Sequence, residues 1–158
     1  MHESLRRSLL IIAFGVALAA CLPAAVASLL PVATGPLVTV TTRGGECPDG
    51  PCGSTVVLER NGQVHQTAPT EATFGTVPVN ALAALDTAIK TTDFDAIRSR
   101  KFTGQCPTAY DGQEVIYEFG APGGVQRIAS CETEIDPNHP VFVAVAAALQ
   151  AAGTTPAP

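Results

Sequence analysis

The sequence predicts an α+β domain of two layers, in which helices pack on one face of an antiparallel sheet of about five strands. Short segments of alternating or β-branched residues occur in pairs joined by glycine-rich turns, which is typical of antiparallel hairpins. Segments with apolar residues at helical spacing lie between and after these pairs. Four cysteines in the same region predict two disulfides. The predicted domain covers residues 37–150.

The N-terminal segment has the pattern of an export signal. A basic pair, Arg6-Arg7, precedes an apolar run over residues 9–20 that is too short to predict a membrane span. The sequence Leu18-Ala19-Ala20-Cys21 resembles the lipobox of bacterial lipoproteins. The resemblance implies cleavage before Cys21, lipid on its thiol and a membrane partner reached through the acyl chains.

The parts expected around this cleavage site are a signal peptide over residues 1–20 and a tether over residues 21–36. A second cleavage site, after Ala27, also fits a signal peptidase and remains open. Cleavage there would give a secreted protein without lipid. Both alternatives export the domain.

The four cysteines that follow Cys21 form an even number, which fits disulfides in an oxidising compartment. We predict the pairs Cys47–Cys52 and Cys106–Cys131, because each would close a locally folded unit. The two other pairings remain open. The spacing lacks the Cys-x-x-Cys pattern of zinc and thioredoxin-like sites, so no metal and no cofactor is expected.

The first three strands are predicted from β-propensity and turn residues. β-branched residues at 37–42 predict the first strand, and glycine and proline in 43–53 predict a loop. Residues 54–60 form the next strand, and Asn61-Gly62 predicts a type I′ turn, which needs positive φ at both positions. The polar return strand, 63–67, is expected at the sheet edge.

Two helices are expected after a connector over residues 68–76. The first has Pro78 in its first turn, and its apolar stripe has helical spacing. The residues of this stripe are Val79, Leu82, Leu85 and Ile89. Thr92 is expected to cap a short second helix that buries Phe94 and Ile97.

A second hairpin is expected between Cys106 and Cys131. Val115, Tyr117 and Phe119 alternate with Glu114, Ile116 and Glu118, the pattern of a strand with one buried face, and residues 120–124 are expected to form a five-residue turn. This loop length places Val125 opposite Phe119.

The last helix is predicted to begin at Pro140 and to bury Phe142, Val145 and Leu149. The remaining residues, 151–158, are small, polar and proline-bearing, so they are expected to be disordered.

The charge of the chain argues against a nucleic-acid partner. Nine basic residues stand against fourteen acidic ones, which gives a net charge of −5. No basic patch is present to bind a phosphate backbone.

The densest polar stretch is Tyr110-Asp111-Gly112-Gln113-Glu114. Asp111 and Glu114 could act as a general acid and base or as oxygen ligands for a cation. A turn at Asp111-Gly112 that starts the hairpin explains the same residues. The chain contains no Gly-x-Ser-x-Gly elbow, no Ser-x-x-Lys motif and no phosphate loop, so the sequence favours a protein that is not an enzyme.

Two cysteine-bearing loops have the composition of rigid recognition loops. The Cys47–Cys52 loop and residues 105–110 combine proline with a predicted disulfide, and Tyr110 is the natural anchor. The candidate binding surface is therefore Tyr110 with Asp111 and Glu114. The alternative is that the disulfides only stabilise a small exported domain.

In outline, residues 37–150 resemble small domains of unassigned function that occur in bacterial exported proteins and lipoproteins. The features shared along this region are a first strand, the Cys47-Pro48 loop, a hairpin at Asn61-Gly62, a helix, Asp93-Phe94, a second hairpin and a final helix at Pro140. The resemblance implies no functional residue.

The sequence as a whole predicts a bacterial lipoprotein on the periplasmic or cell-surface side of a membrane. Its expected role is that of a non-catalytic binding or envelope-associated module, with an envelope protein or a small molecule as partner. One alternative is an inhibitor of an exported enzyme that presents the Cys47–Cys52 loop. Another is a small hydrolase or cation-dependent enzyme centred on Asp111 and Glu114.

Overall fold

A computed structural model describes residues 35–47 and 50–154. The predicted signal peptide, Cys21 and nearly all of the predicted tether lie outside the described residues, as do residues 155–158, which are half of the predicted tail. The elements in chain order are β1 (Val38–Cys47), β2 (Gly50–Leu58), β3 (Gln63–Ala68), β4 (Ala72–Thr76), α1 (Val79–Thr91), α2 (Phe94–Ser99), η1 (Pro107–Tyr110), β5 (Gln113–Ala121), β6 (Gly124–Ala129) and α3 (Pro140–Ala151).

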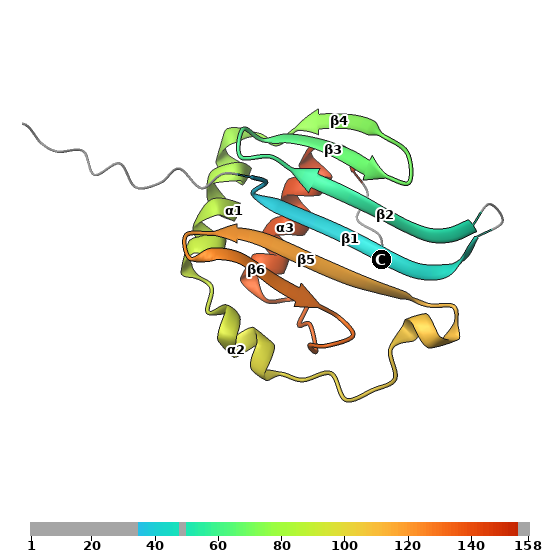
Figure 1. Cartoon of the computed structure of the whole chain (residues 1–158). Coiled ribbons are helices and arrows are strands. Elements are labelled where there is room, and N and C mark those ends of the chain that lie inside the picture. Colours follow the sequence, from blue (N-terminus) through green and yellow to red (C-terminus); the bar gives the residue numbers. More distant parts are fainter. Residues whose placement is uncertain (1–34, 48–49, 155–158) are drawn as a thin grey trace, which may run out of the picture. The chain divides into compact units, whose positions relative to one another are not determined.

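The strands form one antiparallel sheet in the order β4-β3-β2-β1-β5-β6. Helices α1 and α3 lie on the same face of this sheet, and neither of them covers the other face (Figure 1). The predicted α+β class is confirmed. The expected strand count of about five is wrong, because the described sheet has six strands.

The additional strand is β4, which lies in the segment expected to be a connector. Its residues pair with β3 in the register His65↔Thr73 and Gln66↔Ala72. Because β4 is an edge strand, only Phe74 among its five residues is even half-buried, and the apolar alternation that marks a strand is missing. β4 also pairs with the outer side of β3, so β3 is not the edge strand that the sequence predicted.

The turn between β2 and β3 differs from the predicted type I′ geometry. Gly62 has a φ of 88°, but Asn61 is not among the described residues with positive φ. The amide of Gly62 donates to the carbonyl of Glu59, and Val77 donates to the carbonyl of Gly62, both at 2.9 Å. Gly62 is therefore the left-handed residue that closes a longer turn, and that turn contacts the chain just before α1.

The ladder of β1 and β2 continues into the segment expected to be a loop. Arg43 pairs with Gly53, and Cys47 still pairs with Gly50. Between these pairs the register shifts at Gly44 and Gly45, whose φ angles are 94° and 81°. The glycines form a bulge rather than ending the strand, because positive φ lets the chain absorb extra residues and resume pairing.

The β5–β6 hairpin has a two-residue turn instead of the expected five. Ala121 pairs with Gly124, and Phe119 pairs with Gln126 rather than with Val125. A shift of one residue moves every side chain of β6 to the opposite face. Val125 is consequently 69% exposed, and Ile128 is 1% exposed.

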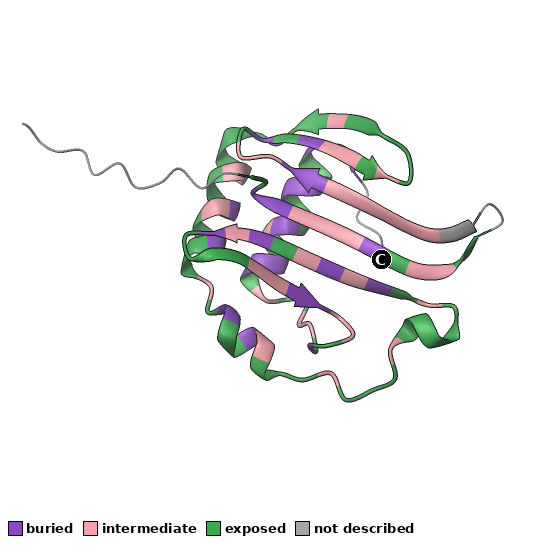
Figure 2. Ribbon diagram, in the orientation of Figure 1, coloured by how far each residue is buried: buried purple, intermediate pink, exposed green. Residues whose placement is uncertain are grey.

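The core lies between the sheet and the helices, with Phe119 of β5 near its centre. Phe119 is completely buried, and its ring contacts Phe94 of α2 and Phe142 of α3. Phe142, Val145 and Leu149 are buried as predicted. Figure 2 shows the buried residues on the inward sides of these helices.

Two details of the helices correct the sequence prediction. Val79, expected in the buried stripe of α1, is 81% exposed because it is the first residue of the helix, whereas Leu85 and Ile89 are buried. The cap of α2 is Asp93 instead of Thr92, and its carboxylate accepts from the amides of Asp95 and Ala96.

Within the described residues, every helix falls short of the length or apolar character that a membrane crossing requires.

Candidate functional site

The predicted disulfide pairs are confirmed. Cys47 is bonded to Cys52, and Cys106 is bonded to Cys131, with Cα–Cα distances of 5.3 and 5.0 Å. The first bond joins β1 to β2 near their common turn. The second joins the residue before η1 to the residue that follows Ser130 at the base of the β5–β6 hairpin.

The two disulfide-bonded loops meet at one end of the sheet. We call this region the twin-loop end and define it as residues 44–47 and 50–53 together with residues 105–112. β1 pairs with β5 in the register Gly44↔Gln113, which brings the segment before β5 beside the bulge of β1. Figure 1 shows η1 and the outer ends of β1 and β2 at the right of the molecule.

Glycines let the backbones of the two loops approach closely. A Cβ atom on Gly44 would lie 2.5 Å from Cγ2 of Thr108 and 2.8 Å from the carbonyl oxygen of Gly112. A Cβ atom on Gly45 would lie 3.5 Å from the carbonyl oxygen of Asp111. Gly44 is thus required twice, for the positive φ of the bulge and for the space that the second loop occupies, whereas Gly45 is required for its positive φ.

Asp111 ties the second loop to the first. It is the one described non-glycine residue in the left-handed region, with a φ of 65°, and it ends η1. Its carboxylate accepts a hydrogen bond from the backbone amide of Glu46. The next residue, Gly112, donates its amide to the carbonyl of Pro107 at 2.8 Å and closes the turn.

Tyr110 lies on the outside of this assembly. Tyr110 is 68% exposed, although the η1 turn that carries it directly follows Cys106, which is bonded to Cys131. The phenol hydroxyl donates to the side-chain carbonyl of Gln105 within the same loop. In Figure 2 the whole η1 turn is exposed. The predicted anchor is therefore presented to solvent on a constrained backbone.

Glu114 is buried and therefore does not belong to this exposed surface. It lies on β5 with 2% exposure, and its carboxylate accepts from Nε of Arg43 on β1 at 2.6 Å. Asp111 and Glu114 each have a structural partner, and neither lines the cavity described below. Within the described residues, no three His, Cys, Asp or Glu side chains converge as metal ligands. No observation here favours the enzyme alternative.

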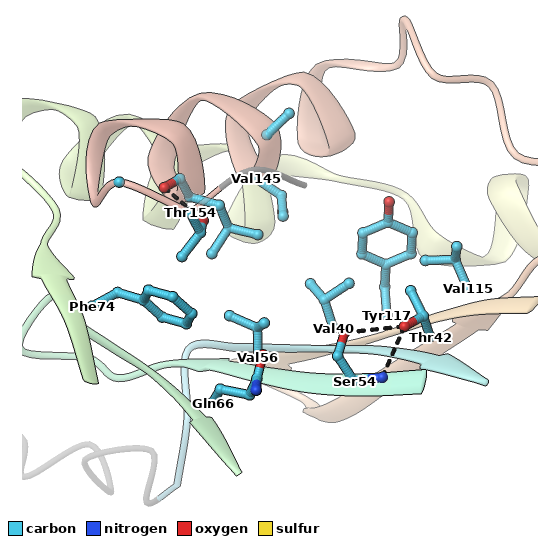
Figure 3. Close-up of a pocket in the computed structure, with 13 residues that line it drawn as sticks. Val40, Thr42, Ser54, Val56, Gln66, Phe74, Val115, Tyr117, Val145 and Thr154 are labelled. Carbon is cyan, nitrogen blue, oxygen red and sulfur yellow. Dashed lines mark hydrogen bonds between the residues drawn. The ribbon is translucent and has the colours of Figure 1, made fainter. Parts of the chain in front are cut away.

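A cavity that the sequence analysis missed lies between α3 and the helix-covered face of the sheet. Its volume is about 360 Å³. Thr42 and Ser54 line it, on the face of β1 and β2 that also carries Val40 and Val56 (Figure 3). These two polar residues in the alternation of β1 and β2 were the available signal in the sequence.

The close approach of the two loops predicts a large difference between two glycine variants. Gly44→Ala is expected to lower the free energy of unfolding by about 1–3 kcal/mol, because the added methyl group clashes with Thr108 and disfavours the left-handed backbone. Gly123→Ala is the matched control. Gly123 has no atom within 4 Å of the added Cβ and lies outside the left-handed region, so it should change stability by less than about 1 kcal/mol. Urea unfolding of both variants measures the difference, and equal stability would contradict the described packing.

The fold and the site together define a class: a two-layer α+β domain with two disulfides and a constrained double loop at one end of its sheet. The chain matches no family model, no curated protein and no solved structure.

Proposed function

We propose that this chain is an exported bacterial lipoprotein that binds another protein of the cell envelope through its twin-loop end, without catalysing a reaction. The observation that carries the proposal is the exposure of Tyr110 on a backbone constrained by a disulfide, by the Asp111 hydrogen bond and by contact with the bulge of β1. The lipid attachment rests on the lipobox sequence that ends at Cys21.

The rigidity of the twin-loop end supports specific binding. Ordering a flexible loop costs free energy on association, and a loop that is already ordered avoids most of that cost. Tyrosine is enriched among the residues that dominate binding energy, since it offers a large apolar surface and a hydroxyl with little rotamer entropy. Tyr110 is such a tyrosine, and the loop that carries it is already ordered.

The geometry of β1 is compatible with an anchor upstream of the sheet. The chain enters β1 at Val38, and the twin-loop end lies at the far end of the same ten-residue strand. At about 3.3 Å per residue the strand is roughly 30 Å long. The chain therefore enters the sheet at the end remote from the twin-loop end.

A matched pair of variants tests the binding surface. Tyr110 and Val125 are 68% and 69% exposed, but Val125 lies beside the β5–β6 turn at the opposite end of β5. Tyr110→Ala is expected to weaken capture of the partner from an envelope fraction roughly 30-fold, which corresponds to a hot-spot loss of about 2 kcal/mol. Val125→Ala should leave capture unchanged. Equal capture by both variants would contradict binding at the twin-loop end.

The anchor is tested separately by the intact mass of the mature protein. Cleavage before Cys21 with acylation gives a chain that begins at Cys21 and carries lipid mass, and Cys21→Ser should release the protein from the membrane fraction. A lipid-free chain that begins at Ser28 would remove the lipoprotein part of the proposal and leave the binding part standing.

Inhibition of an exported enzyme is a second candidate for the same surface. The structure favours it because η1 lies directly beside the Cys47–Cys52 hairpin, so a partner would meet two constrained loops at once. In this case the captured partner is an enzyme, and its turnover falls as the protein is added. Tyr110→Ala should raise the inhibition constant by the same factor as it weakens capture.

A further inference from the structure

The cavity at α3 forms because the helices cover the sheet unevenly. Its helical wall is the second half of α3, with Val145, Ala146 and Leu149, and its floor comes from the sheet. In Figure 1, α1 lies behind the left end of the sheet, and none of its residues lines the cavity, so α3 is the one described helix over the cavity floor. Space is left between the helix and the strands.

The floor of the cavity is apolar and incompletely covered. Val40, Val56 and Tyr117 come from the three central strands, and Phe74 comes from the edge strand β4 (Figure 3). These four side chains are only half-buried, although they lie on the same face as fully buried core residues. An apolar surface of this kind gains free energy when a ligand removes it from water.

The lining carries hydrogen-bonding groups but no charge. None of the described residues around the cavity is Asp, Glu, Lys, Arg or His. The hydroxyls of Thr42 and Ser54 lie 3.0 Å apart, and the amide nitrogen of Gln66 donates to the carbonyl of Thr70 at 3.0 Å. Tyr117 adds a phenol that can donate a hydrogen bond; it is neutral near neutral pH, and burial raises its pKa further. A charged ligand would lose its hydration here without a counter-charge.

We propose that this cavity binds a neutral amphipathic small molecule with an aromatic or aliphatic body and one hydroxyl or carbonyl group. The volume of about 360 Å³ falls at the lower end of the range of small-molecule sites, roughly 300–1,000 Å³. The apolar body lies against Val40, Val56 and Phe74, and the polar group bonds to the Thr42–Ser54 pair or to Tyr117. The residues that line this cavity are separate from those of the twin-loop end. Failure of the ligand proposal would therefore leave the proposed function unchanged, and the reverse also holds.

The probe for the test is 2-naphthol, a neutral aromatic molecule with one hydroxyl, added to the mature full chain with ¹³C-labelled valine and leucine methyl groups. Saturable shifts are expected for the methyls of Val40, Val56 and Val145. The exposed methyls of Val79 and Val125 serve as the internal reference, since they lie outside the cavity.

Two neighbouring alanines of α3 provide the matched variants. Both are exposed, but only Ala146 lines the cavity and Ala147 does not. Ala146→Phe fills the cavity from its rim and is expected to weaken binding at least 10-fold, whereas Ala147→Phe should change it less than 2-fold. Ala146→Leu, a smaller substitution, should weaken binding in the same direction and provides the test if the phenylalanine variant is unstable.

Three results would overturn the proposal. One is the lack of a saturable shift at millimolar probe, and another is equal weakening by the Ala146 and Ala147 variants. The third is a set of contacts between the cavity methyls and residues 22–34 or a second copy of the chain, because the space would then be filled by protein.

Discussion

Phe119→Ala is expected to lower the free energy of unfolding by about 3–5 kcal/mol. Phe119 is completely buried at the centre of the core, and its ring centroid lies 5.1 Å from that of Phe94 and 6.0 Å from that of Phe142. The substitution removes contacts between β5 and both α2 and α3, and these elements cannot collapse into the space without moving the sheet. The cavity it leaves adds to the lost transfer free energy.

Guanidinium unfolding of the oxidised protein measures this loss. The control is Tyr110→Ala, which also removes an aromatic ring but from a side chain that is 68% exposed. Its stability should stay within about 0.5 kcal/mol of the unsubstituted protein. A loss below about 1 kcal/mol for Phe119→Ala would contradict the position of this ring in the core.

The two disulfides are expected to contribute unequally. Replacing Cys106 and Cys131 together by alanine should cost about 3–4 kcal/mol, because their bond closes a segment with a sequence separation of 25. The same replacement of Cys47 and Cys52 should cost about 2 kcal/mol, since their separation is only 5 and the unfolded chain loses less entropy to so short a ring.

Denaturant midpoints of the two double variants, compared with the oxidised protein, give the order of the two losses. Alanine is used in both pairs so that no free thiol can exchange. An equal or reversed order would contradict the loop-entropy explanation.

In addition, the Cys106/Cys131 variant should lose partner capture, because this bond holds the η1 loop that presents Tyr110.

The buried side chains were largely predictable from local pattern. The spacing of Phe142, Val145 and Leu149 identified the inward face of α3. In β5 the alternation identified the face on which Phe119 is buried, but Val115 and Tyr117 are only half-buried there, and the burial of Glu114 and Ile116 on the other face was not predicted. These patterns arise because burial on one face imposes the period of the element itself. They do not show which other element each strand or helix contacts.

The errors concern features that depend on partners distant in the chain or on exposure. β4 escaped detection because an exposed edge strand needs no apolar alternation. The register of β6 depended on whether two or five residues formed the turn, and glycines at 120, 123 and 124 were compatible with both. The observed register places Ile128 in the core, and the local composition of the turn does not show which of the two registers does this.

The assembly of the candidate site was not predictable from the sequence. Tyr110, predicted as the anchor of a recognition loop, is exposed, whereas Glu114 is buried, which was not expected. The hydrogen bond from Glu46 to Asp111 and the ion pair of Arg43 with Glu114 join residues 65 and 71 positions apart. Both depend on the pairing of β1 with β5, and no local signal in either segment specifies the other.

The central position of β1 has a mechanical consequence. β1 is bonded to β2 on one side and to β5 on the other, and both ladders are antiparallel. A tension applied between Leu37 and the twin-loop end therefore runs along the axis of this strand. Because antiparallel hydrogen bonds lie perpendicular to the strands, such a tension loads many of them in shear at once instead of opening them one by one. The strand that separates the chain's entry from its exposed loops is also the one best placed to resist being pulled out.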